Sequence, residues 1–221
     1  VTGVQTCALP IFDIRSPMKH EVGPPSGVFH TSASRISKLS INAEPHSSEF
    51  EAFFSSLPAL SDLHLRSGTT DIARVVASFS PSTRHTLLSL SFSATGYLSY
   101  NIDDAFAGFD SLQHLVLWST QFEITPAFFS TLSPLPLVSV TFHGPRNPYL
   151  RHIIDFVANE KPATLGEISV DVGLGLEKPQ WSTWRNEAEA RRLADTCKRC
   201  GVSLSGSIRE AMALLHIQAQ S

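Results

Sequence analysis

Cysteines and glycosylation signals are scarce in this chain. Its 221 residues include only three cysteines, Cys7, Cys197 and Cys200, which is too few for a secreted scaffold held together by disulfides. No asparagine is followed two residues later by serine or threonine, so the sequence has no N-glycosylation acceptor. Both features favour a reducing compartment, and we expect a cytoplasmic or nuclear protein.

Long apolar runs and concentrated charge are also missing. No apolar run reaches the roughly 18 residues of a membrane-spanning helix. The formal net charge is −3, which does not suit a general nucleic-acid binder. The nine histidines show no metal-ligand spacing. We therefore expect no membrane or nucleic-acid partner, no metal site and no cofactor.

An apolar triplet of the form L-x-x-L-x-L recurs at nearly even intervals. Its first positions lie 24, 27, 25, 25 and 28 residues apart. The six copies are Ile36/Leu39/Ile41, Leu60/Leu63/Leu65, Leu87/Leu90/Phe92, Leu112/Leu115/Leu117, Leu137/Val140/Phe142 and Leu165/Ile168/Val170. A period in the twenties built on this triplet is typical of a leucine-rich repeat, in which each unit adds one short strand to a curved parallel sheet.

Segments with helical apolar spacing lie between the predicted strands. In 150–160, Leu150, Ile153, Ile154 and Val157 fall on one face of a helix. A single helix–strand unit can bury its apolar face only against neighbouring units, so the pattern predicts an α/β solenoid with helices on the convex side. The predicted helices cover 50–57, 71–79, 102–109, 126–132, 150–160, 187–200 and 208–217.

The chain is predicted to divide into four parts. Residues 1–11, VTGVQTCALPI, resemble the translation of a common sequencing adapter, so we expect the natural protein to be truncated here. Residues 12–34 contain three prolines and no periodicity, which predicts an irregular entry segment. The solenoid is predicted over 35–205. Residues 206–221 are predicted to form a C-terminal capping helix, because the end of a solenoid exposes its core.

The repeat resembles the leucine-rich repeats of fungal F-box-like proteins, from about Ile36 to Leu204. This resemblance implies the substrate-recognition region of a ubiquitin-ligase adaptor, with a ligase subunit bound through an F-box upstream of the fragment. The sequence departs from the usual repeat eight positions after each first leucine, where Asn or Cys ties successive turns together. Those positions hold Glu44, Gly68, Thr95, Thr120, Pro145 and Gly173.

Motifs for catalysis are weak. The pair Cys197 and Cys200 falls at the end of a predicted helix, whereas a redox motif needs the helix start, where the dipole lowers a thiol pKa. The glycines Gly173 and Gly175 lack the remaining residues of a phosphate-binding loop, and no Gly-x-Ser-x-Gly sequence occurs. We therefore expect a protein that is not an enzyme.

Strand positions between the buried leucines supply the predicted binding surface, on the concave face. Trp118 lies at its centre, and a tryptophan close to arginine and histidines has the composition of a binding hot spot. The alternative is that Trp118 folds back onto its own loop. The predicted partner-binding residues are His64, Arg66, Ser93, Val116, Trp118, Thr141, His143 and Asp171.

These observations favour a protein–protein interaction module with a protein partner on the concave face. The leading hypothesis is the substrate-recognition region of a truncated F-box-like ubiquitin-ligase adaptor. The alternative is a scaffold or regulatory leucine-rich-repeat protein unrelated to ubiquitin ligation. An enzyme of unrelated fold is the third hypothesis, and it would need a cluster of titratable residues that no motif indicates.

Overall fold

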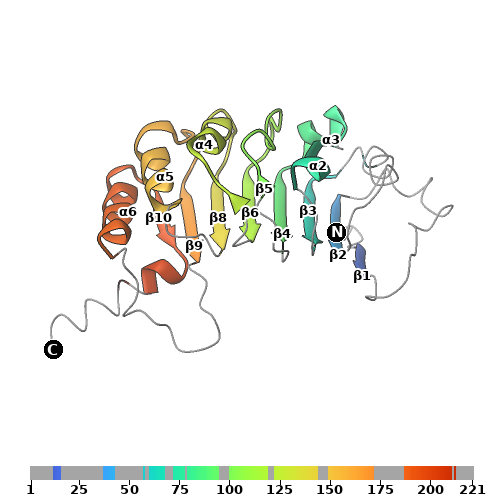
Figure 1. Cartoon of the computed structure of the whole chain (residues 1–221). Helices are drawn as coiled ribbons and strands as arrows, with labels where there is room; N and C mark the ends of the chain where they lie inside the picture. Colours follow the sequence, from blue (N-terminus) through green and yellow to red (C-terminus); the bar gives the residue numbers. More distant parts are fainter. Residues whose placement is uncertain are drawn as a thin grey trace, which may run out of the picture.

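The computed structural model is an α/β structure built on one parallel sheet (Figure 1). The described residues are 12–15, 37–42, 57, 60–67, 72–77, 79–94, 100–118, 122–143, 149–171, 187–210 and 212. The adapter-like residues 1–11 lie outside them, as do most of the predicted helix 50–57 and the end of the predicted cap, 213–221.

The eight strands of the main sheet lie side by side in chain order, and every neighbouring pair is parallel. A second, two-stranded sheet joins β5 (Tyr100–Asn101) and β7 (Phe122–Glu123). The predicted parallel pairing of strands is therefore confirmed. The main-sheet strands are β1 (Phe12–Arg15), β2 (Lys38–Asn42), β3 (Asp62–Ser67), β4 (Ser89–Ala94), β6 (His114–Trp118), β8 (Ser139–His143), β9 (Glu167–Asp171) and β10 (Ser203–Ser205).

The strand register places equivalent residues of the apolar triplets next to one another. Leu63 pairs with Leu90, and Leu90 pairs with Leu115, so the second positions form one continuous buried row across the sheet. The third positions form another, which includes Phe92 and Phe142. Because side chains alternate along a strand, this face carries the core and the opposite face carries the polar residues.

Helices line one side of the sheet in the same order as the strands (Figure 1). The helix α4 begins after Thr125, whose Oγ1 accepts a hydrogen bond from the Ala127 N–H at 3.1 Å, an arrangement typical of an N-cap followed by proline. The helices are α2 (Ile72–Ala77), α3 (Pro81–Thr86), α4 (Pro126–Leu132), α5 (Tyr149–Asp155), the π-helical η2 (Phe156–Glu160) and α6 (Glu187–Arg199).

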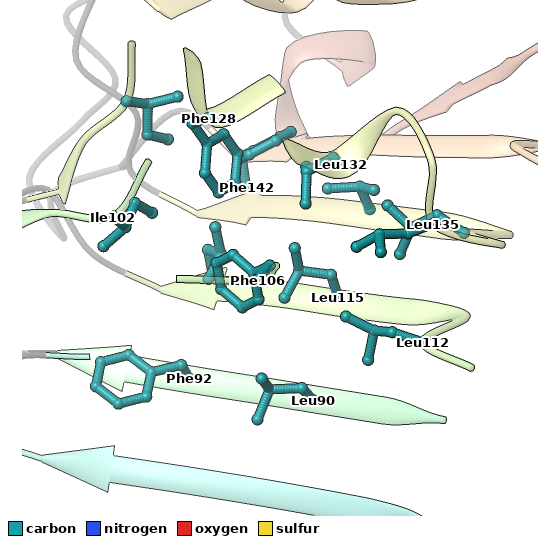
Figure 2. Packing of buried hydrophobic residues seen from close by; sticks show 14 of the residues in the cluster. Leu90, Phe92, Ile102, Phe106, Leu112, Leu115, Phe128, Leu132, Leu135 and Phe142 are labelled. Carbon is teal, nitrogen blue, oxygen red and sulfur yellow. The ribbon is translucent and has the colours of Figure 1, made fainter. Parts of the chain in front are cut away.

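Aromatic side chains fill the space between the sheet and the outer layer (Figure 2). Phe106 and Phe128 meet edge to face, with ring centroids 5.8 Å apart. Phe129 contacts Phe142 of β8 edge to face and Phe156 of η2 at a tilted angle. Such aromatic pairs join neighbouring segments of the chain, so the core is continuous along the sheet.

Three local predictions are wrong or incomplete. Residues 102–109 form successive turns rather than a helix, with hydrogen bonds between residues three apart and Gly108 at a φ of 83°. The helix predicted over 150–160 changes to π-helical geometry at Phe156. Within the predicted irregular segment 12–34, Phe12–Arg15 forms strand β1, whose alternating apolar and polar residues match a strand.

Threonine hydroxyl groups form hydrogen bonds between neighbouring segments of the chain just before the strands. The Thr86 Oγ1 donates to the Leu60 carbonyl at 3.1 Å, and the Thr164 Oγ1 donates to the Leu137 carbonyl at 2.8 Å. Each acceptor is the first residue of the preceding triplet. The six positions where Asn or Cys is usual lie outside the described residues. Side-chain ties between units therefore exist here at a position that the sequence analysis did not identify.

Candidate functional site: the polar face of the sheet

The face of the sheet opposite the core is lined mainly by polar side chains, and we call it the polar face. Strand register arranges its residues in three rows that cross the sheet. The first row is Lys38, Asp62, Ser89, His114, Ser139, Glu167 and Ser203. The second is Ser40, His64, Ser91, Val116, Thr141, Ser169 and Ser205. The third is Arg66, Ser93, Trp118, His143 and Asp171, and the register continues it through Asn42 of β2 to Arg15 of β1.

Trp118 is the large apolar side chain of the third row. Its indole stacks on the His143 imidazole of the next strand, with ring centroids 3.6 Å apart and an angle of 26° between the planes. It nevertheless remains 47% exposed. The alternative prediction, that Trp118 folds back onto its own loop, concerns residues 119–121, which lie outside the described part of the chain. The stacking supports one face of the indole and leaves a large part of the ring accessible.

His143 is fixed from the opposite side by Asp171 of β9. The Nδ1 of His143 lies 2.7 Å from the Asp171 Oδ2. Burial lowers the pKa of His143 and the Asp171 carboxylate raises it, and burial is the larger effect. A neutral imidazole beside a carboxylate carries its proton on Nδ1, which donates to Asp171. His143 is therefore oriented by two neighbours, Trp118 and Asp171.

Asp171 connects this row to the C-terminal turn. Its Oδ1 accepts a hydrogen bond at 2.7 Å from the backbone N–H of Ser207, the first residue of a short helix. The preceding Gly206 has a φ of 87° and approaches the β9 backbone so closely that a Cβ would lie 2.7 Å from the Val170 carbonyl oxygen. The chain of contacts thus runs from Trp118 through Asp171 to a segment 89 residues later.

Most other long polar side chains of the polar face are paired with a neighbour on the next strand. His64 Nδ1 lies 2.8 Å from the Ser91 Oγ, and His114 Nδ1 lies 2.8 Å from the Ser139 Oγ. These cross-strand contacts orient both imidazoles. They are the kind of pair that stabilises a sheet by a few tenths of a kcal/mol to about 1 kcal/mol.

The structure places all eight predicted site residues on the polar face, in two adjacent rows. It brings three of them into contact, Trp118, His143 and Asp171. Arg66 and Ser93 are in register on neighbouring strands of the same row. The remaining predicted residues, His64, Val116 and Thr141, lie in the middle row.

Sequence reasoning missed the contribution of Gly206 and Ser207, which are 35 and 36 residues from Asp171. The glycine in Ser205-Gly206-Ser207, directly after β10, was the available signal, because a turn that needs a positive φ selects glycine.

The cysteine pair lies at the end of α6 and at its border with the core. Cys197 is buried, and this burial, with a smaller contribution from Cys200, raises the pKa of its thiol to about 11. A thiol in such surroundings is protonated and unreactive at neutral pH. Among the described residues, no group of three His, Cys, Asp or Glu side chains is arranged to hold a metal ion.

Within the same described part of the chain, every helix is too short or too polar to cross a lipid bilayer. Comparison with protein-family models, with curated proteins and with solved structures found no match to this chain.

Proposed function

We propose that this chain is a leucine-rich-repeat solenoid that acts as a protein–protein interaction module and binds its partner on the polar face. Support comes from the order of the strands, which follows the chain without exception, and from the in-register rows of triplet residues. Stacked units with one strand each produce this arrangement. A solenoid of this kind presents an extended surface made of strand residues.

The exposure of the Trp118 side chain is the observation that carries the proposal. A tryptophan that is 47% exposed leaves apolar area in water unless a partner covers it. Tryptophan and arginine are enriched among residues that dominate binding energy, and row three contains both. The indole is already held in place by His143, so less side-chain entropy is lost when a partner binds.

An affinity capture experiment tests the proposal. The full chain serves as bait in cell extract, beside Trp118→Ala and the control Leu88→Ala, which removes a side chain that is 39% exposed and precedes β4 rather than lying in the three rows. We expect at least one protein to be captured by the unmodified chain and by Leu88→Ala, and lost with Trp118→Ala. Purified, that protein should bind Trp118→Ala with a Kd at least about 30-fold weaker, since a hot-spot truncation costs about 2 kcal/mol or more. Identical captures by all three baits would contradict the proposal.

A narrower proposal is that the module recognises substrates within an F-box-like ubiquitin-ligase adaptor. It rests on the resemblance of the repeats to those of fungal F-box-like proteins. Sequencing the complete transcript tests it, because the adaptor requires a short Leu/Pro-rich helical module upstream of the repeats. An upstream nucleotide-binding or kinase-type module would instead favour the scaffold or regulatory protein.

A further inference from the structure

The charged side chains of the polar face differ in whether they are already paired. The structure describes five of them. Lys38 lies 3.3 Å from Asp62, and Asp171 is held by His143. Glu167 accepts a hydrogen bond from the Ser205 hydroxyl at 2.8 Å. The fifth charged side chain, Arg66, has no hydrogen bond or ion pair to any other described residue.

Arg66 is exposed and stands in the same row as Trp118, two strands away. At a strand spacing of about 4.8 Å, their Cα atoms are separated by about 10 Å. The residue between them is Ser93, which has a short and partly exposed side chain. One row therefore presents an exposed guanidinium, which has no ion pair among the described residues, and an accessible indole, separated by a small residue.

The acidic end of the row offers less to a partner. Both oxygens of the Asp171 carboxylate are engaged, Oδ2 by His143 and Oδ1 by the Ser207 backbone N–H. A basic partner would have to compete with those donors. An acidic partner at Arg66 displaces no hydrogen bond or ion pair to any residue that the structure describes. A partner that buried the guanidinium without supplying a counter-charge would remove its hydration without compensation.

We propose that the polar face binds a protein segment in which a carboxylate lies about 10 Å from an aromatic side chain. The carboxylate pairs with Arg66, and the aromatic ring packs on the accessible part of Trp118. This inference rests on the proposed function and specifies the chemistry of its partner. A carboxylate is favoured over a phosphate, because among the side chains that the structure describes on this face Arg66 is the one Lys or Arg without an ion pair, and Lys38 is engaged by Asp62.

Short peptides of defined composition test this pairing. In a polyproline helix, residues three apart lie on the same side and about 9 Å apart. The probe is therefore the capped peptide PPYPPEPP, with PPYPPQPP and PPYPPKPP as charge controls and a phosphoserine version in place of the glutamate. Binding is followed by NMR through the indole N–H signal of Trp118, which the variant Trp118→Phe assigns.

We expect the glutamate peptide to shift the Trp118 signal and to bind at least about fivefold tighter than the glutamine peptide. Arg66→Gln should remove that difference, whereas Arg191→Gln, which removes an arginine on α6, should retain it. Higher salt should weaken the glutamate peptide and leave the glutamine peptide unchanged. Because the Arg66 side chain is exposed and has no hydrogen bond or ion pair to another described residue, Arg66→Gln should leave the fold intact.

Several results would overturn the inference. They are an unshifted Trp118 signal, equal affinity for the glutamate and glutamine peptides, a preference that persists in Arg66→Gln, or binding of the phosphoserine peptide more than tenfold tighter than the glutamate peptide. The capture experiment separates this failure from failure of the proposed function. If capture depends on Trp118 and not on Arg66, the proposed binding module stands and the proposal of an acidic partner is refuted.

Discussion

Replacing Gly206 by alanine tests the link between the C-terminal turn and the polar face. Gly206 has a φ of 87°, which L-residues with a side chain rarely adopt. An added Cβ would also meet the Val170 carbonyl oxygen at 2.7 Å, the Ser169 hydroxyl at 2.8 Å and the Asp171 Oδ1 at 2.9 Å. Since Val170 lies within β9, between β8 and β10, its carbonyl cannot move away, and the turn itself must shift.

The magnitude follows from two separate costs. A positive φ costs an alanine roughly 1 to 2 kcal/mol. Moving the turn breaks the bond from the Ser207 N–H to the Asp171 carboxylate, and a hydrogen bond to a charged group contributes about 1.5 to 3 kcal/mol. Gly201→Ala is the matched control, because Gly201 has a φ of 69° and no atom within 4 Å of an added Cβ. It should incur the first cost and not the second.

Hydrogen exchange at the Ser207 amide is the direct assay. Gly206→Ala should lower its protection relative to Gly201→Ala by roughly 10- to 150-fold, the equivalent of about 1.5 to 3 kcal/mol. The indole signal of Trp118 should also shift in Gly206→Ala, since Asp171 positions the His143 ring on which the indole stacks. Equal protection in the two variants would refute the assignment of Gly206 and Asp171 as the anchor of the C-terminal turn.

Three further predictions concern stability and reactivity. Burial lowers the pKa of His143, so the imidazole binds a proton more tightly in the unfolded chain than in the folded chain. The free energy of unfolding should therefore fall as the pH drops from 7 through the ordinary histidine pKa of 6.5. Urea titrations should show a weaker pH dependence for His143→Phe. Cys197 has a pKa of about 11, so its thiolate fraction is roughly a hundredfold smaller than it would be at the ordinary pKa of 9.0. After treatment with iodoacetamide at about pH 7.5 under conditions that alkylate Cys200, mass spectrometry should find Cys197 unmodified. Leu115→Ala, in the fully buried centre of the sheet, should lower the unfolding free energy by about 3 to 5 kcal/mol, against less than about 1 kcal/mol for the exposed Val138→Ala.

The buried face of the sheet was predictable because its constraint is local and periodic. A strand residue such as Leu90 must be apolar to lie between Leu63 and Leu115, and the same requirement returns in every unit. The start of α4 was equally predictable from the sequence. A threonine followed by proline can accept, through its own hydroxyl, a hydrogen bond from a free backbone N–H in the first turn of the helix.

The outer layer was predicted less well because apolar spacing does not determine backbone geometry. Ile102, Phe106 and Phe109 are all buried, as a helix over 102–109 would require. The chain instead buries them through consecutive turns that end with Gly108 in the left-handed region. The short helix α3 was missed although Ser80 followed by Pro81 is a start signal, since six residues contain too little periodicity to recognise.

The candidate site was predictable as a set of positions and not as a set of contacts. Alternation along the strands placed Trp118, His143 and Asp171 on one face, and the parallel register placed them in one row. The stacking of the indole and the bond from His143 to Asp171 depend on side-chain rotamers. The bond to Ser207 depends on a turn 36 residues further along the chain. The rotamers have no signature in a single sequence, and Gly206 indicates a turn without indicating that the turn approaches Asp171.

Preorganisation explains why these distant contacts bear on binding. An indole that rotates freely in the unbound protein loses that freedom when a partner covers it, at a cost of about 0.5 to 1.5 kcal/mol. Here His143 restricts the Trp118 ring before any partner arrives, Asp171 restricts His143, and the Ser207 N–H restricts Asp171. If Trp118 is the anchor, part of its affinity is therefore determined by residues that no partner touches, and truncating His143 should weaken binding mainly by freeing the indole.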